Sequence, residues 1–237
     1  MTIFMMGDST MKFNDFLRYP QTGWGQVMQM FVKEDVLVLD YAENGRSTKS
    51  FIAEGRFAKI LNQIKPNDIV ICQFGHNDEK EYDKARYTAP YGEYQQNLKY
   101  FADEVHKHGA EIIYATSITR HKFDNGVCVN SHGEYPNAML EFAKNNGYTC
   151  IDLNQKTIDL YTKLGEDNSK KFHMIFDKGV YSHYPDGSDD HSHLVYTGAL
   201  MVAEIFTKEV LKTNHILKNY LIDVNSSADI DWAMLKD

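Results

Sequence analysis

A serine near the start of the chain and an acid–histidine pair near its end are the residues best suited to chemistry. Ser9 stands in Gly-Asp-Ser-Thr after the apolar residues 3–6, and Asp190 and His193 are spaced i and i+3. On a turn or a first helical turn, that spacing puts both side chains on one face. A serine hydrolase needs a hydroxyl nucleophile, an imidazole base and a carboxylate that orients the base. Gly-Asp-Ser alone more often caps the next element, so the second segment is what favours a catalytic site.

Two further loops carry groups that could stabilise an oxyanion. Gly45 lies in Ala-Glu-Asn-Gly-Arg-Ser after residues 36–40, and Asn77 lies in Gly-His-Asn-Asp after residues 69–74. In an open parallel sheet, ligands bind beyond the carboxyl ends of the strands. The backbone N–H groups of Ser9 and Gly45 and the side-chain amide of Asn77 could therefore converge on one oxygen. Losing one such donor typically costs roughly 3–4 kcal/mol of transition-state stabilisation.

Short apolar runs alternate with segments of helical spacing along the whole chain. The runs are nearly continuous rather than alternating, which is typical of strands buried on both faces of a parallel sheet. We expect a single domain over residues 1–237, with a three-layer α/β/α sandwich, flavodoxin-like, and a five-stranded parallel sheet of order 2-1-3-4-5. The expected strands are 3–6, 36–40, 69–74, 112–115 and 148–153, and the expected helices are 24–32, 49–64, 91–108, 136–146 and 197–212.

Composition excludes several classes of protein. A net charge of −8 argues against nucleic acid as a partner, because phosphate binding needs a concentrated basic face. No apolar run approaches the ~20 residues of a membrane span. Residues 1–6 carry neither the basic leader nor the small-residue cleavage site of a secretion signal, and a signal removed beforehand would leave the same pattern. Three scattered cysteines do not form a disulfide framework. We therefore expect a cytoplasmic protein that engages neither nucleic acid nor membrane; its oligomeric state is left open.

Acidic and histidine side chains crowd near the end of the chain, and a metal site is an alternative interpretation of them. Their spacing fits no standard zinc pattern, and no cysteine joins them. We expect neither a metal nor any other cofactor. The residues concerned are His183, Asp186, Asp189, Asp190, His191 and His193.

The motifs together resemble a known family. Gly-Asp-Ser at 7–9, Gly45, Gly-His-Asn-Asp at 75–78 and Asp-x-x-His at 190–193 are similar to the four motif blocks of SGNH (GDSL-like) hydrolases. The finer resemblance, through Asn-Gly-Arg-Ser and Gln-Phe-Gly-His-Asn-Asp among others, is to rhamnogalacturonan acetylesterases (carbohydrate esterase family 12). One departure is Ser192, which stands where that group often has threonine. Both residues carry a hydroxyl.

The resemblance implies roles for the residues singled out above. Ser9 would be the nucleophile, His193 the base and Asp190 its partner, with Ser9, Gly45 and Asn77 lining the oxyanion hole. The substrate would be an acetylated oligosaccharide, most specifically one from rhamnogalacturonan.

Substrate contacts are less clear from the sequence than the chemistry. Tyr82, Tyr87 and Tyr91 could stack on sugar rings or pack as ordinary loop residues. Arg46 beside Gly45 could make the cleft locally positive for an acidic pectin fragment, and Lys12, Arg18 and Lys122 are weaker candidates for the same role.

Three alternatives stay open at this point. The first is a general or xylan acetylesterase, and the second is a thioesterase or lipase of the same fold, which should show an apolar groove. The third is a non-catalytic sugar-binding module, which should show a broken triad.

Overall fold

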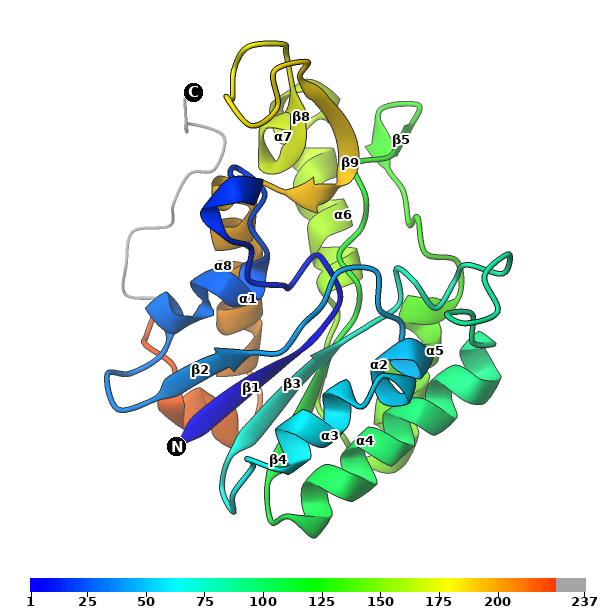
Figure 1. The fold of residues 1–237 in the computed structure, drawn as a ribbon, viewed down its shortest axis with the longest axis vertical. Coiled ribbons are helices and arrows are strands. Elements are labelled where there is room, and N and C mark those ends of the chain that lie inside the picture. Colours follow the sequence, from blue (N-terminus) through cyan, green and yellow to red (C-terminus); the bar gives the residue numbers. More distant parts are fainter. Residues whose placement is uncertain (225–237) are drawn as a thin grey trace.

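The short apolar segments of the sequence pair into one parallel sheet. In the computed structural model, which describes residues 1–224, the strand order is β2-β1-β3-β4-β7 and every neighbouring pair is parallel (Figure 1). The predicted order is confirmed, with β7 as the fifth strand. The strands are β1 Thr2–Gly7, β2 Leu37–Asp40, β3 Ile69–Gln73, β4 Glu111–Ala115 and β7 Cys150–Ile151.

Side chains of the central strands alternate between two apolar cores, although all of β3 is buried. Ile69 and Ile71 belong to one core, and Val70 and Cys72 belong to the other. Successive side chains of a strand point to opposite faces of the sheet, so both faces must be covered by other elements. A continuous apolar run is the consequence of that double burial.

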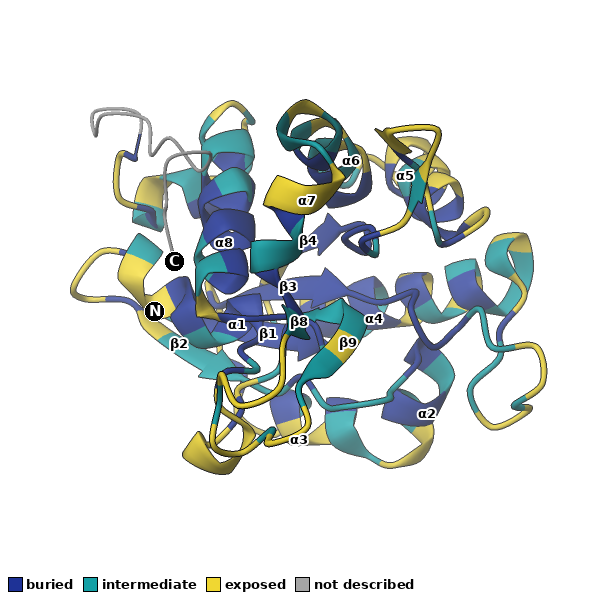
Figure 2. Cartoon of the chain, turned by 90° about the horizontal axis from the view of Figure 1, so that it is seen from above, coloured by how far each residue is buried: buried dark blue, intermediate teal, exposed yellow. Residues whose placement is uncertain are grey.

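Helices cover the two faces and give the predicted three-layer α/β/α sandwich. The burial colours of Figure 2 mark the inner strands and the helix sides against them as buried. One core is completed by α1 Trp24–Val27, α6 Leu153–Leu164 and α8 Tyr196–Leu211. The other is completed by α2 Thr48–Ala53, α3 Arg56–Leu61, α4 Gln95–Lys107 and α5 Tyr135–Asn146.

Three predicted helices are shorter or interrupted. The predicted helix 49–64 divides into α2 and α3 at Gly55, whose φ of 67° is left-handed and ends a right-handed helix. The predicted helix 91–108 begins later, as α4, because Gly92 is not helical. The predicted helix 24–32 passes from α1 into a 3-10 segment. The shorter elements are η1 Phe16–Arg18, η2 Met28–Phe31, η3 Pro90–Tyr94, β5 Phe123–Asp124, β6 Val127–Cys128, α7 Glu166–Ser169, η4 Lys170–Phe172 and η5 Ile216–Tyr220.

A separate antiparallel pair, which the sequence did not predict, lies beyond the sheet and carries the acid–histidine segment. It consists of β8 His173–Phe176 and β9 Ser188–Leu194. The pairing jumps from Met174↔Asp190 to His173↔Leu194, so the residues between Asp190 and Leu194 bulge out of the ladder. The predicted turn is therefore a bulge within a strand, and the predicted helical alternative is wrong.

None of the helices formed by residues 1–224 combines the length and the apolar character that crossing a bilayer requires.

Candidate active site

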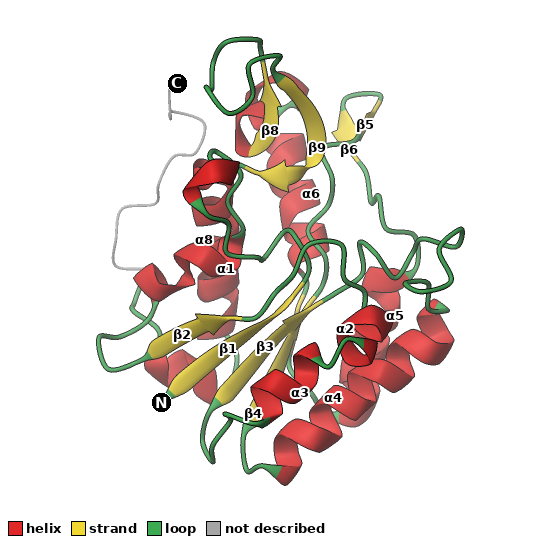
Figure 3. Cartoon of the chain, in the orientation of Figure 1, coloured by secondary structure: helices red, strands yellow, loops and turns green. Residues whose placement is uncertain are grey.

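The loops that follow β1, β2 and β3 lie together at one end of the sheet. Figure 3 shows these loops at the carboxyl ends of the strands, on the side where the β8–β9 pair is placed. A backbone bond from the Glu43 N–H to the Gly7 carbonyl, 3.0 Å long, joins the first two loops. The third is joined to the second by the Asn77 side-chain amide, which donates to the Arg46 carbonyl at 3.1 Å.

Ser9 sits in a turn that its buried neighbour holds in place. Oδ1 of Asp8 accepts hydrogen bonds from the backbone N–H of Thr10 at 3.0 Å and from its hydroxyl at 2.9 Å. The other carboxylate oxygen lies 3.2 Å from Nδ1 of His76. Burial alone would raise the pKa of Asp8, but the His76 and Thr10 contacts lower it, so the carboxylate stays charged.

Gly7 permits the close approach of β1 and β3 immediately before that turn. A Cβ at this position would lie 2.7 Å from the Gln73 carbonyl oxygen and 2.9 Å from Sδ of Met11. Any side chain would therefore push the Ser9 turn away from the sheet.

A continuous hydrogen-bond chain joins Ser9 to the bulge of β9. The Ser9 hydroxyl donates to Nε2 of His193 at 2.9 Å, and Nδ1 of His193 donates to Oδ2 of Asp190 at 2.6 Å. Oδ1 of Asp190 accepts from the backbone N–H groups of Ser192 at 2.8 Å and His193 at 3.1 Å. The bulge thus folds back on the acid and directs the imidazole toward the hydroxyl, which is the arrangement a Ser–His–Asp triad requires.

The environment of Asp190 keeps its carboxylate ionised. Partial burial raises its pKa, but the hydrogen bond and the charge of His193 and the two backbone donors outweigh burial and hold the pKa far below the usual range. A negative carboxylate at Nδ1 fixes the tautomer in which Nε2 is free to accept a proton.

The three groups expected to bind an oxyanion lie on the three loops that meet at this end of the sheet. Within residues 1–224, neither the backbone N–H of Ser9 nor that of Gly45 donates a hydrogen bond. The Asn77 amide donates to the Arg46 carbonyl, and an amide NH₂ has a second hydrogen to give. Each group thus retains a free donor.

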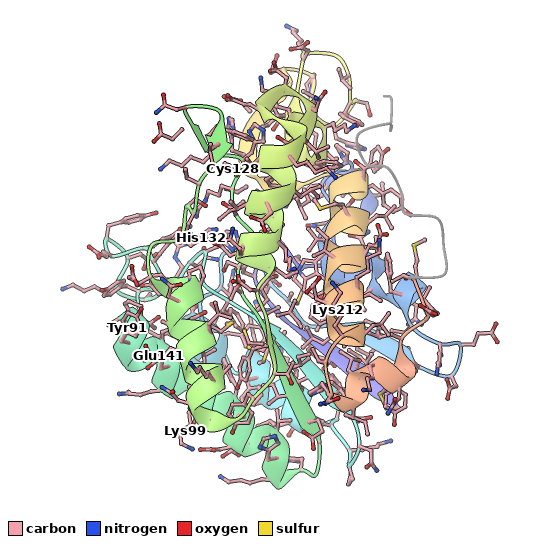
Figure 4. The ribbon with its side chains drawn as sticks, turned by 180° about the vertical axis from the view of Figure 1, so that it is seen from behind. Tyr91, Lys99, Cys128, His132, Glu141 and Lys212 are labelled. Atoms are coloured by element: carbon pink, nitrogen blue, oxygen red, sulfur yellow. The ribbon has the colours of Figure 1, made fainter. Side chains whose placement is uncertain are left out.

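Of the four residues expected to contact substrate, two line a cavity and two do not. Tyr82 and Tyr87 line a cavity of about 580 Å³ between the loop after β3 and the start of α5. The Tyr91 hydroxyl donates at 2.8 Å to Glu134, which lines this cavity. Figure 4 labels Tyr91 and His132, of which His132 also lines the cavity. Arg46 is engaged elsewhere, because its Nε contacts both carboxylate oxygens of Glu54, at 3.1 and 3.0 Å.

Arg120, which was not among the residues expected from the sequence, holds the β9 bulge in place through a hydrogen bond to Ser192. Nε of Arg120 donates to the Ser192 hydroxyl at 3.1 Å, its Nη1 donates to the Ser131 carbonyl at 3.0 Å, and its Nη2 pairs with Glu79. His132 approaches the same carboxylate, with Nδ1 3.0 Å from Oε2. Arg120 follows β4, so extending the inspection of strand ends to the fourth strand would have found it.

The part of the chain that the structure describes contains no group of three or more His, Cys, Asp or Glu side chains that could hold a metal ion.

The fold and the Ser9–His193–Asp190 arrangement at the carboxyl ends of the strands together define the class of protein. It is an ester-hydrolysing enzyme built on an α/β/α sandwich with a parallel sheet. The chain belongs to the GDSL-like lipase/acylhydrolase family, whose sequence model matches residues 5–191. The family resemblance inferred from the motifs is thereby confirmed.

Two curated relatives cover nearly the whole chain. One is rhamnogalacturonan acetylesterase RhgT of Bacillus subtilis, 38% identical over 221 residues, which are 93% of this chain and 94% of that protein. The other is the rhamnogalacturonan acetylesterase of Emericella nidulans, 25% identical over 253 residues, covering 99% and 93%.

Solved structures share the fold. The YXIM protein of Bacillus subtilis matches with a TM-score of 0.75 and 24% identity over 88% of this chain, which spans 55% of that protein. Axe2, an acetylxylan esterase from Geobacillus stearothermophilus, matches with a TM-score of 0.65 and 15% identity, covering 88% of this chain and 93% of that one.

Proposed function

We propose that this protein removes O-acetyl groups from carbohydrate, specifically from rhamnogalacturonan oligosaccharides, through an acyl-enzyme on Ser9. The observation that carries the proposal is the chain of contacts Ser9–His193–Asp190, at 2.9 and 2.6 Å. Relatives named as rhamnogalacturonan acetylesterases over nearly the whole chain support the substrate. We also propose that residues 1–237 act as one hydrolase domain, since both ends of the chain contribute to this site.

In the first half-reaction, the Ser9 oxygen attacks the acetyl carbonyl carbon while Nε2 of His193 takes the hydroxyl proton. The charge of the resulting imidazolium is balanced by Asp190, which stays ionised. Collapse of the tetrahedral intermediate breaks the bond to the sugar oxygen. His193 gives its proton to that oxygen, and the deacetylated sugar leaves.

In the second half-reaction, water takes the place of the sugar. His193 accepts one proton from the water as the water oxygen attacks the acetyl–Ser9 carbonyl. That proton then returns to the Ser9 oxygen as acetic acid departs, and the acid ionises to acetate in solution. The enzyme ends in its starting protonation state, because His193 returns each proton that it accepts, first to the sugar oxygen and then to Ser9.

The oxyanion of both tetrahedral intermediates would accept hydrogen bonds from the free donors of Ser9, Gly45 and Asn77. These donors belong to three different loops that the sheet and their own cross-bonds hold together. Donors fixed before the reaction cost little reorganisation when the charge develops, which is why such sites contribute strongly to rate.

Acetate release from a panel of acetylated substrates tests this function. The wild type should release acetate from rhamnogalacturonan oligosaccharides faster than from acetylated xylan, and Ser9→Ala should lower kcat by roughly 10⁴-fold or more. A preference for acetylated xylan would contradict the proposed rhamnogalacturonan substrate but would not contradict the proposed acyl-enzyme mechanism. Full activity of Ser9→Ala would reject the acyl-enzyme mechanism.

A further inference from the structure

The cavity beside Asn77 contains a lysine that forms no ion pair with an acidic side chain among the described residues. Lys80 lines this cavity, and its backbone N–H donates to the Asn77 carbonyl at 3.3 Å, so it follows directly from the loop of the proposed oxyanion hole. Among residues 1–224, no acceptor lies within hydrogen-bonding distance of its Nζ, and no carboxylate forms an ion pair with it.

The surroundings of Lys80 disfavour its positive charge. Partial burial lowers the pKa of Lys80, and the positive charges of Arg86 and Arg120 lower it further, against weaker opposing effects of Glu79 and Asp8. Those two arginines have their own partners. Nε of Arg86 contacts Asp83 at 2.6 Å, and Arg120 pairs with Glu79.

Neither of the two remaining acids that line the cavity, Glu81 and Glu134, forms an ion pair with Lys80. Glu134 accepts the Tyr91 hydroxyl at the edge, and Glu81 is exposed at the rim. A partly buried cation that forms no ion pair and shares its cavity with a second cation, Arg120, is stabilised by an anion that enters beside it.

Two of the four cations suggested by the sequence for this purpose, Arg46 and Lys12, are already paired with acids of the protein. Arg46 contacts Glu54, and Lys12 contacts Glu43 at 2.8 Å. The acidic net charge of the chain is therefore compatible with an acidic ligand, provided that the ligand reaches Lys80 rather than these two residues.

We propose that Lys80 binds the carboxylate of a uronic acid residue next to the acetylated sugar, and so determines specificity for acidic oligosaccharides. The proposal rests on the function proposed above and adds the group that recognises the acidic unit. The Tyr82 side chain, 82% exposed, and the neighbouring Tyr87 offer aromatic faces on which a sugar ring packs. The carboxylate would then lie beside Lys80 in the cavity that Arg120 also lines.

Two forms of one substrate test this directly: acetylated rhamnogalacturonan oligosaccharides with free carboxylates, and the same oligosaccharides after methyl esterification. Lys80→Gln should raise KM for the free-acid form about tenfold, the effect of losing one charge-assisted hydrogen bond at a partly exposed site, with a much smaller change for the ester form. Lys80→Arg should restore most of the difference. Lys65→Gln, an exposed lysine at the amino end of β3, is the matched control and should behave as the wild type.

Salt provides a second readout. Raising NaCl from 20 to 300 mM should raise KM of the wild type for the free-acid form and have a smaller effect on Lys80→Gln, because screening weakens only a charge interaction that is present.

The outcomes separate this proposal from the one on which it rests. Equal KM ratios for the two substrate forms in wild type and Lys80→Gln, with acetate still released, would overturn the Lys80 assignment alone. No acetate from either form, while 4-nitrophenyl acetate is hydrolysed, would overturn the proposed function together with this subsite.

Discussion

At the scale of single residues, the site depends on hydrogen bonds made by two carboxylates that differ in how deeply they are buried. Asp8 is fully buried and serves the Ser9 turn, whereas Asp190 is partly exposed and serves His193. The two carboxylates near Ser9 thus have different proposed roles: Asp8 holds the turn in place, and Asp190 orients the imidazole. The division follows from their positions in the chain, because Asp8 directly precedes Ser9 whereas Asp190 is spaced to face the imidazole of His193. The catalytic roles themselves stay predictions.

Replacing Asp190 by asparagine separates the charge of the acid from its shape. Asp190→Asn keeps a group beside Nδ1 of His193, but it removes the negative charge and permits the wrong tautomer, so kcat should fall by about 10³–10⁴-fold with little change in KM. Steady-state kinetics on 4-nitrophenyl acetate measures this. Asp189→Asn, at the exposed neighbour, is the control. A loss of less than tenfold for Asp190→Asn would contradict the role assigned to the acid.

At the scale of elements, the segment that carries the acid and the base is the one the sequence could not place. Residues 188–194 are polar, with neither the apolar continuity of a buried strand nor helical spacing. Their conformation comes from pairing with β8 and from the bracing of Ser192 by Arg120. The central strands were predictable because double burial makes their sequences continuously apolar. The break at Gly55 was missed because the apolar pattern continues on both sides of it.

Arg120 should contribute to stability and to activity together. Arg120→Met removes the brace on the β9 bulge and leaves Glu79 without its cation in a largely buried place, so the free energy of unfolding should fall by about 2 kcal/mol and kcat should decrease. Urea unfolding and kinetics measure the two effects.

The matched comparison is an exposed ion pair on α4. Lys99 contacts Asp103 at 2.8 Å, and Lys99→Met should change the unfolding free energy by less than about 0.5 kcal/mol. If Arg120→Met were equally harmless in both measurements, Arg120 would not be a positioning residue.

At the scale of the whole molecule, the fold brings together groups that lie 184 positions apart in the chain. The Thr22 N–H donates to the Leu194 carbonyl at 2.9 Å, and Gln21 bridges Val195, which ties the segment after Ser9 to the end of β9. The sheet order was predictable from the parallel pattern and the motif loops. The β8–β9 pair was not, because its contacts are long-range and its sequence is polar.

A buried histidine at the start of β8, His173, should make stability depend on pH. Burial, with the nearby charges of His121 and His191, lowers the pKa of His173 to about 3. The unfolded chain takes up this proton near pH 6.5. Between these values the unfolded state binds more protons, so stability falls as the pH decreases, by about 1.4 kcal/mol per pH unit from this residue.

The contribution of His173 is isolated by comparing variants. Asp40 and Asp78, whose pKa burial raises to about 7, contribute with the opposite sign. His173→Phe should therefore lose less stability than the wild type between pH 6.5 and 4.5 in urea unfolding, whereas the exposed control His106→Phe should follow the wild type. Parallel pH curves for His173→Phe and wild type would show that His173 is not the group responsible.

The central claim is that the Ser9 oxygen is the atom acylated during turnover. Intact-protein mass spectrometry and peptide mapping after reaction with a fluorophosphonate measure this directly. The account predicts one adduct per chain, on the peptide containing Ser9, with none in Ser9→Ala and strongly slowed labelling in His193→Ala. An adduct on another residue, or an unlabelled Ser9 in protein that still hydrolyses esters, would contradict it.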